Sequence, residues 1–285
     1  MTTILYVKNQ SSNVPRNVLI AVSNSLQEPW LSFLNEGLAK TWLSDLDVNE
    51  NQILHFFSNP PNKLMQTLNK FIERERWHRG KARSYLLAYM LMFLLKPIKN
   101  YVPAYELAKE EVILARGAQL RVKFPDTYAS LRWRRLSVID FYLKNTDFDY
   151  LIFVNPSTYL NLRALKDFLH KAKNLDYGGM IKNSADSPFV VGSFIVLSRR
   201  CAKEILEKRN ALPTHVMDDV AIGSLLSENG IKPTSLNSLE LLTEEINLQN
   251  FDFTNCINYK IKVLQNQKRL DVFVLKAIHA QYKAF

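Results

Sequence analysis

Two adjacent carboxylates, Asp218 and Asp219, stand where the sequence predicts the start of a helix. The helix is expected over Val220–Asn229, because its apolar positions face one way and Gly230 follows as a C-terminal stop. Either carboxylate can cap this helix, and the positive end of the helix dipole then favours its ionised form. A carboxylate held in this way can act as a general base that takes a proton from an attacking hydroxyl. The alternative is purely structural, since aspartate is among the commonest residues at a helix N-terminus.

The elements that must position this pair follow a strand–helix alternation. Continuous apolar runs predict buried strands, and segments with apolar residues at helical spacing separate them. This pattern is typical of a mixed, mostly parallel α/β sheet flanked by helices, which binds ligands beyond the carboxyl ends of its strands. The strand over 149–154 is the most hydrophobic and should be central, so the loop Asn155–Thr158 borders the expected crevice. The predicted strands cover 17–22, 52–57, 111–115, 120–124, 149–154 and 189–197, and the predicted helices begin near 127, near Asn161 and after Ser198.

The composition bounds size, partners and compartment. The 285 residues suffice for one α/β domain, and 37 Lys and Arg against 27 Asp and Glu give a net charge of +10. Such a balance suits an anionic partner: nucleic acid, an acidic membrane surface or a phosphate-bearing substrate. Cys201 and Cys256 have neither metal-type spacing nor a disulfide framework, so a reducing, cytoplasmic location is expected. The eight glycines form no phosphate-binding loop, which argues against a dinucleotide fold of the GxGxxG type.

An insertion over about 62–108 interrupts the strand–helix alternation. Six cations, from Lys70 to Arg83, surround Trp77, and an apolar run over 85–95 follows directly. That run has eleven residues, too few for a membrane span of about 20, and the polar segment Met1–Arg16 predicts neither a signal peptide nor an anchor. Two interpretations remain open: a helix that lies on an anionic membrane surface, or an insertion whose apolar run packs onto the domain.

Four blocks, in order, resemble the fringe/β-1,3-glycosyltransferase family (glycosyltransferase family 31 and its bacterial and viral relatives). The last contains the two aspartates and is similar to the family's "x-[ED]-D-V-x-x-G". The others are similar to "F-x-D-[ST]-Y-x-N-L", to the strand that carries the family's DxD-type carboxylates, and to "[FY]-x-S-G-x-G-Y-x-[LM]-S". The blocks are Phe124–Leu131, Phe148–Tyr159, Phe189–Ser198 and Met217–Gly223, within roughly 120–235.

This resemblance implies a single GT-A (Rossmann-like, nucleotide-sugar-binding) domain over 1–285. It also implies a nucleotide-sugar donor, most often a UDP-sugar, and transfer with inversion to an acceptor hydroxyl. Carried over by position, Asp219 would be the general base and Asp218 its neighbour. Gly192 and Ser193 would line the sugar pocket, and the loop that begins at Val22 and Ser23 would lie with Asp126 near the nucleotide.

One departure from the family pattern concerns the metal. Asn155-Pro156-Ser157 stands where the family has carboxylates for Mn²⁺ or Mg²⁺, and amide or hydroxyl oxygens are weaker ligands for a hard dication. The family's late histidine is not obvious either, because His279 lies near the end and Asn258–Lys260 occupies a plausible equivalent place. We therefore expect no metal cofactor, with Asn155 and Ser157 hydrogen-bonding the ribose or a sugar hydroxyl.

Without a metal, the charge of the leaving diphosphate needs another electrostatic partner. The candidates are Lys260 and Lys262, then Lys268 and Arg269, with Arg132, Arg134 and Arg135 less suited. Each of these cations, taken singly, can also be an ordinary solvated charge.

The sequence thus predicts an inverting, metal-independent glycosyltransferase that acts on a glycan or lipid-linked acceptor. The alternative is a non-catalytic protein of the same fold that only holds a glycan or nucleotide sugar. Nucleic-acid binding is suggested by the charge alone and is not expected.

Overall fold

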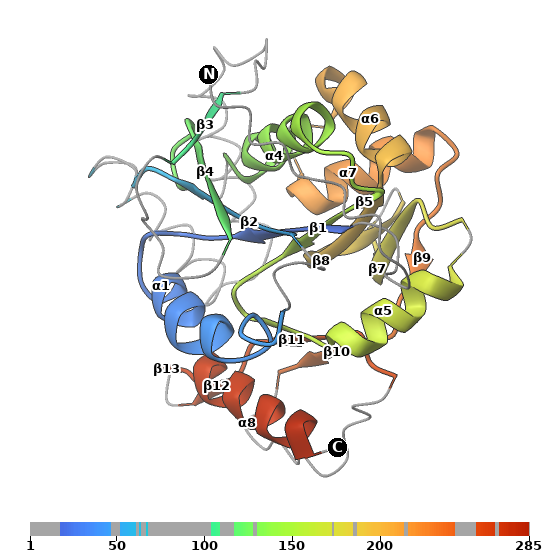
Figure 1. Cartoon of the computed structure of the whole chain (residues 1–285). Helices are drawn as coiled ribbons and strands as arrows, with labels where there is room; N and C mark the ends of the chain where they lie inside the picture. The colour runs from blue at the N-terminus through green and yellow to red at the C-terminus, as the bar shows by residue number, and fades with distance from the viewer. Residues whose placement is uncertain are drawn as a thin grey trace.

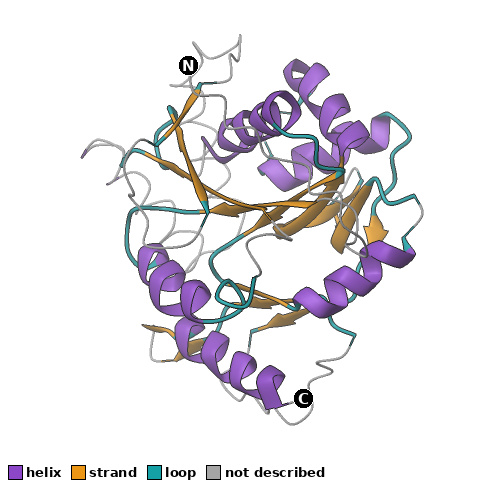
Figure 2. Ribbon diagram, viewed as in Figure 1, coloured by secondary structure: helices purple, strands orange, loops and turns teal. Residues whose placement is uncertain are grey.

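The computed structural model describes residues 18–46, 52–60, 63, 67, 104–108, 117–127, 130–172, 174–184, 187–213, 216–242, 255–265 and 268–284. An eight-stranded sheet in the order β3-β4-β2-β1-β5-β8-β7-β9 forms the centre of the molecule (Figure 1). Helices flank it on both sides (Figure 2). The expected α/β fold, a mixed, mostly parallel sheet flanked by helices, is therefore confirmed.

The sheet strands are β1 (Val18–Ser23), β2 (Gln52–Ser58), β3 (Tyr105–Leu107), β4 (Ala118–Val122), β5 (Tyr150–Val154), β7 (Tyr177–Asn183), β8 (Pro188–Ser198) and β9 (Thr234–Ser235). The helices are α1 (Trp30–Ser32), α4 (Leu131–Asn145), α5 (Leu162–Lys171), α6 (Arg199–Glu207), α7 (Asp218–Glu228) and α8 (Asp271–Ala284). Short helical turns, η1 (Phe33–Gly37), η2 (Leu38–Lys40) and η5 (Arg209–Ala211), complete the helical part of the described residues.

The two central strands are buried on both faces, because side chains alternate along a strand with a period of two. Ile20 and Val22 of β1 belong to a core shared with α5 and α8, whereas Leu19 and Ala21 belong to a core shared with α4, α6 and α7. The five residues of β5 are all buried, which confirms its predicted central place.

Strand β8 brings its first half to the carboxyl edge of the parallel strands. It runs antiparallel to β5, with Val154 opposite Phe194, so residues before Phe194 continue past the end of β5. Beyond this point the Asn155 amide donates to the Ser193 carbonyl at 3.0 Å. The β8 backbone therefore borders the crevice that the sequence predicts after β5.

A second sheet lies below the first one. It pairs β10 (Ser238–Leu241), β11 (Asn258–Ile261) and β6 (Thr158–Leu160), and α8 packs beside it (Figure 1). A hairpin of β12 (Leu264–Gln265) and β13 (Lys268–Arg269) follows. Since β6 begins directly after the Asn155–Ser157 turn, this sheet continues the chain from the carboxyl end of β5, where the sequence predicts a crevice.

Two predicted helix starts need correction. Helix α7 begins at Asp218, two residues earlier than expected, and its N-cap is Met217, so neither aspartate caps it. Helix α4 begins at Leu131 rather than near 127, because a hydrogen-bonded turn, in which the Ser130 amide donates to the Thr127 carbonyl, precedes it. The predicted stop is confirmed: Gly230 has a φ of +72°, which favours glycine.

Several predictions fall on residues outside the described ones: the cations and apolar run of the 62–108 insertion, the strand over 111–115, and the polar N-terminus. The insertion was predicted to be helical, and this is wrong at its end, where β3 pairs with β4 in the main sheet. Among the described residues, no helix has the length and apolar character that crossing a membrane requires.

Candidate active site

Asp219 is held by backbone amides from two elements. Its Oδ2 accepts from the Gly192 amide of β8 at 2.9 Å, and its Oδ1 accepts from the Val220 amide of α7 at 2.9 Å. Position in the first turn of α7 adds the positive end of the helix dipole. The sequence prediction that this carboxylate has a fixed direction therefore agrees with the structure, although the amides and not a capping bond fix it.

Asp218 forms a buried ion pair. Its Oδ2 lies 2.9 Å from Nη1 of Arg135, and both side chains are less than a tenth exposed. The other guanidinium nitrogen of Arg135, Nη2, donates to the Gly192 carbonyl at 2.6 Å. The guanidinium also stands over the ring of Phe153 in β5, 5.5 Å from its centroid. One arginine thus links α4, β5, β8 and α7 around the carboxylate pair.

Gly192 leaves no room for a side chain. A Cβ built there would lie 2.9 Å from Nη2 of Arg135 and 3.1 Å from Oδ2 of Asp219. Because its amide faces one carboxylate and its carbonyl faces the arginine, this residue is the backbone junction of the cluster. The structure places the Gly192 backbone beside Asp219 and Arg135, and the place of Gly192 and Ser193 in a sugar pocket stays a prediction.

The charges around Asp219 tune its proton affinity. Burial raises the pKa of Asp219 above its usual value, and the neighbouring charge of Asp218 raises that pKa further. Arg135 and the two amide donors act in the opposite direction. A carboxyl group whose pKa is raised in this way is a stronger proton acceptor than an ordinary surface aspartate.

A second charged group lies at the carboxyl end of β1. Arg134, next to Arg135 on α4, donates to Oδ1 of Asp126 at 2.6 Å and to the Asn24 carbonyl at 2.5 Å. The Asn24 amide group in turn donates to the Val22 carbonyl at 3.0 Å. Asp126 is thus near the loop after β1, where the sequence predicts it, but its carboxylate is neutralised by Arg134.

Three buried polar atoms at this edge have no partner among the described residues: Asn24 Oδ1, Ser58 Oγ and Thr127 Oγ1. Ser58 ends β2, and the Asp126 amide donates to the carbonyl of Asn59, the next residue. Val22, by contrast, is fully buried within the sheet and supports this loop instead of offering its side chain. Ser23 is half-buried at the end of β1.

Sequence reasoning undervalued the arginines of α4, which it gave as less suited candidates. Arg132, Arg134 and Arg135 are each 5% exposed or less, so they are not solvated charges. Arg132 donates to the Val216 carbonyl just before α7, and burial lowers the pKa of Arg132 to about 10, which leaves it charged at neutral pH. The spacing contained a signal: Arg135 is four residues from both Leu131 and Ile139, on the apolar face of the helix.

The Asn155–Ser157 turn lies between the two sheets. The Ser157 carbonyl accepts from the Ile261 amide at 2.8 Å, and Thr158 is opposite Lys260 in the β11–β6 ladder. Asn155 and Ser157 therefore border β11 as well as β8. Carboxylate ligands are absent from this turn, and the described residues include no group of three His, Cys, Asp or Glu side chains that could hold a metal ion.

The candidate cations near the end of the chain differ in whether acidic residues already neutralise them. Lys260 pairs with Glu240 at 2.5 Å, and Glu240 also pairs with Lys182 at 2.6 Å, so two lysines share one carboxylate. Arg269 is held by Asp271 and stands over the rings of Trp30 and Phe33, which removes it from the candidates. Lys262 follows β11 directly, and Lys268 is exposed in the β12–β13 hairpin.

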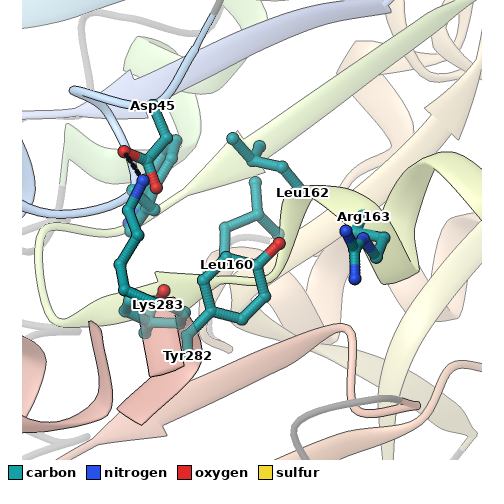
Figure 3. Close-up of a pocket in the computed structure, with 8 residues that line it drawn as sticks. Asp45, Leu160, Leu162, Arg163, Tyr282 and Lys283 are labelled. Atoms are coloured by element: carbon teal, nitrogen blue, oxygen red, sulfur yellow. Dashed lines mark ion pairs between the residues drawn. The ribbon is translucent and has the colours of Figure 1, made fainter. Parts of the chain in front are cut away.

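His279 lies beside a separate cavity and contacts Tyr159, which lines it. Its Nδ1 is 3.1 Å from the Tyr159 hydroxyl and 3.9 Å from Asp45, and burial lowers its pKa. The cavity, of about 350 Å³, opens between β6, α5, α8 and the turn after η2 (Figure 3). Asp45 and Lys283 form an ion pair there at 2.8 Å, and Arg163 and Tyr282 line the space. None of the Asp218–Asp219 cluster lines it.

Comparisons with known proteins complete the description. No family model and no curated protein match the sequence. Among solved structures, this chain is similar to the mannosyltransferase PcManGT from Pyrobaculum calidifontis in complex with GDP-Man and Mn²⁺, with a TM-score of 0.43 and 11% identity over 96% of this chain. It is also similar to the glycosyltransferase GlyE of Streptococcus pneumoniae TIGR4, with a TM-score of 0.38 and 11% identity over 79% of this chain. The chain spans 64% and 45% of the lengths of those two chains.

Proposed function

We propose that the protein is an inverting glycosyltransferase in which Asp219 is the general base. The observation that carries the proposal is the placement of Asp219: two backbone amides aim its carboxylate at the carboxyl edge of the sheet. In a single displacement, the acceptor hydroxyl attacks the anomeric carbon while Asp219 takes the hydroxyl proton. The bond from the anomeric carbon to the leaving nucleoside diphosphate breaks in the same step, on the opposite face, which inverts the anomeric configuration.

The donor is proposed to lie along the same edge, from the loop after β1 to the Asn155–Ser157 turn. Buried polar groups without partners are normally satisfied by water or a ligand, and Asn24, Ser58 and Thr127 contribute three such atoms here. Gly192 and Ser193 border the position of the transferred sugar. UDP is proposed as the nucleotide of the donor on the basis of the family resemblance.

The transfer is proposed to proceed without a divalent metal. Asn155 and Ser157 do not supply the carboxylates that Mn²⁺ or Mg²⁺ prefers, so the donor set at this turn does not fit such an ion. The two lysines that share Glu240 leave one positive charge beside β11, and Lys260 and Lys262 are the proposed partners of the diphosphate.

The proposed acceptor is a glycan or a lipid-linked saccharide. The second possibility suggested by the 70–95 segment is an acceptor presented at an anionic, cytoplasmic membrane surface. A non-catalytic glycan- or nucleotide-sugar-binding protein is the rival function. The raised pKa of Asp219 favours the enzyme, since a binding protein gains nothing from a buried carboxylate poised to accept a proton.

A two-stage experiment tests the proposal. UDP-, GDP-, TDP- and CMP-sugars are first screened for thermal stabilisation, because a ligand at about 100 times its Kd stabilises the fold by about 2.7 kcal/mol. The stabilising donor is then incubated with candidate acceptors, free nucleotide is measured, and NMR gives the anomeric configuration of the product. Binding without turnover would support the rival function, and retention of configuration would overturn the single displacement.

Replacement of the base gives a sharper test. Asp219→Asn keeps the size of the side chain but removes the proton acceptor, so transfer should fall by about 10² to 10⁴ with little change in donor binding. Asp176→Asn is the matched control, because Asp176 is held by Ser198 and Arg200 at the opposite edge of the sheet. Near-normal transfer by Asp219→Asn would contradict the mechanism. If Asp218→Asn alone were inactive, the two roles would be exchanged.

A further inference from the structure

Arg135 contacts residues of the proposed catalytic unit on three elements, β8, α7 and β5. Nη2 donates to the Gly192 carbonyl at 2.6 Å, and Nη1 lies 2.9 Å from Asp218. The Phe153 ring supports the guanidinium from the sheet side. Two of these partners are directly connected to Asp219. The amide of Gly192 donates to its carboxylate, and Asp218 precedes it in the chain on α7.

We infer that Arg135 is a positioning residue that aims the carboxylate of Asp219 through Gly192 and Asp218. This inference rests on the proposed function, since it assigns how the base is held. Arg135 itself does not touch the reacting atoms in this account. It fixes the β8 backbone on one side and the first turn of α7 on the other, and Asp219 spans the gap between them.

The planar geometry of the guanidinium is essential to this role. Two nitrogens on one rigid plane reach a carbonyl and a carboxylate at the same time, whereas a lysine ammonium is a single point charge on a flexible stem. Lysine would keep the charge near Asp218 but would not hold both partners. The neighbouring Arg132 strengthens the same junction by donating to the Val216 carbonyl ahead of α7, which indicates that the start of α7 is fastened to α4.

The charge of Arg135 has a second effect, on proton affinity. The groups that act on Asp219 come from three elements: Asp218 and the Val220 amide on α7, Arg135 on α4 and the Gly192 amide on β8. Asp219 in turn acts on the Tyr177 hydroxyl of β7. The charge of Asp218 also acts on Arg132 and Arg134 of α4 and favours their charged forms. Of these charges Arg135 favours the ionised form of Asp219 and Asp218 disfavours it. Removing Arg135 should therefore raise the pH at which Asp219 loses its proton.

Two substitutions separate position from charge. Arg135→Lys keeps the charge but cannot contact the Gly192 carbonyl and Asp218 at the same time. We therefore expect kcat to fall by about 10²-fold, which is what a misplacement of about 1 Å can cost. The acid limb of its pH profile, where kcat falls as Asp219 gains a proton, should stay near that of the wild type. Arg135→Gln loses both, so kcat should fall and the acid limb of the pH profile should move to higher pH. Donor binding, measured by thermal stabilisation, should change little in either variant.

Arg199→Gln is the matched control. Arg199 also donates to two backbone carbonyls, those of Leu143 and Thr146, and stands over an aromatic ring, that of Tyr142, but outside the cluster. Its loss should lower stability without moving the acid limb. If Arg135→Gln fails to fold because Asp218 is left unpaired, the double variant Arg135→Gln with Asp218→Asn removes both charges, and its kcat should still be low.

A measurement that needs no turnover keeps this inference separate from the proposed function. The carboxyl carbon of Asp219 is followed by NMR in protein labelled with ¹³C-aspartate, and its signal is assigned by its loss in Asp219→Asn. Arg135→Gln should raise the pKa of Asp219, and Arg199→Gln should not. Unchanged kcat and unchanged pKa in Arg135→Gln would overturn the inference even if Asp219 is the base. Inactivity of the wild type with every donor would overturn the proposed function alone.

Discussion

At the scale of single residues, the cluster depends on the one position that has no side chain. Gly192→Ala would place a Cβ within 3.1 Å of both Arg135 and Asp219, so one of these groups must move. We expect kcat to fall by about 10²-fold, because the base is displaced from the attacking hydroxyl. Steady-state kinetics with the identified donor would measure this effect, and the loss of stability from overpacking should be about 1–3 kcal/mol.

Gly230→Ala is the control for this substitution. Gly230 has a φ of +72° and open space around its Cα, so alanine there costs about 1–2 kcal/mol of backbone strain and nothing in packing. The two variants should therefore lose similar stability while only Gly192→Ala loses activity. Equal kcat values in both variants would show that the geometry at Gly192 does not matter for transfer.

The predicted metal independence also depends on single residues. Since Asn155 and Ser157 replace the carboxylates that the family resemblance leads one to expect, activity should survive excess EDTA, and added Mn²⁺ should stimulate it little. The converse variant, Asn155→Asp with Ser157→Asp, should show whether the turn can still accept an ion. A strict Mn²⁺ requirement in the natural sequence would contradict the prediction.

Residue-level reasoning predicted the carboxylates better than their partners. Asp218, Asp219 and Gly192 were found from motif order, and the structure brings them together. The contribution of Arg135 could not be read from the motifs, because its partners lie 57 and 83 positions away along the chain. The sequence did place a charged residue on the apolar face of a helix. Such a position predicts that the side chain is buried, but it does not predict which residues it contacts.

At the scale of elements, the helix starts that the sequence predicted correctly, those of α5 and α6, are the ones with a side-chain cap. Asn161 and Ser198 were expected where α5 and α6 begin, and their side chains accept from the amides of Ala164 and Cys201 at 3.0 and 3.1 Å. Helix α7 has no such bond, and its start was misplaced by two residues. A cap is a local signal, whereas the start of α7 is set by β8 and α4, which are distant in sequence.

The α5 cap makes a testable contribution to stability. Asn161→Ala removes the acceptor for the Ala164 amide, so the free energy of unfolding should fall by about 1 kcal/mol. Urea denaturation measures the change. Asn210→Ala is the control, because Asn210 is exposed in η5 and surface substitutions usually stay within about 0.5 kcal/mol. A stability loss no larger than that of the control would show that the cap bond is not formed in solution.

Short elements escaped prediction for a physical reason. The strands of the second sheet have three or four residues each, so they contain too few apolar residues to show the alternation that predicts a strand. They are stabilised by pairing with each other, since Tyr259 of β11 faces Tyr159 of β6 across the ladder. The long buried strands β1, β5 and β8 were predicted nearly to the residue because burial on both faces leaves a continuous apolar run.

At the scale of the whole molecule, the net charge of +10 needs an explanation that the described site does not give. Inside the site, Arg134 and Arg135 are matched by Asp126 and Asp218, so the cluster contributes little excess charge. Much of the excess lies elsewhere, and six cations are concentrated between Lys70 and Arg83, outside the described residues. A local concentration of this kind is what an anionic surface recognises.

The last prediction is that the 70–95 segment brings the protein to acidic bilayers. Each cation near such a surface contributes about 1 kcal/mol, and insertion of the apolar residues that follow adds to this. Co-sedimentation with phosphatidylserine vesicles should therefore be strong at low salt, weaken as salt screens the charges, and be absent with phosphatidylcholine alone. Replacing the six cations of 70–83 by glutamine should abolish it.

A control variant carries the same charge change elsewhere. Six exposed cations on the described surface are replaced by glutamine: Lys144, Arg163, Lys171, Lys203, Lys208 and Lys232. If net charge alone drives binding, both variants lose it equally; if the segment is the binding element, only the 70–83 variant does. No binding of the natural sequence to acidic vesicles would favour a packed insertion, and the acceptor would then be sought among glycans free in solution.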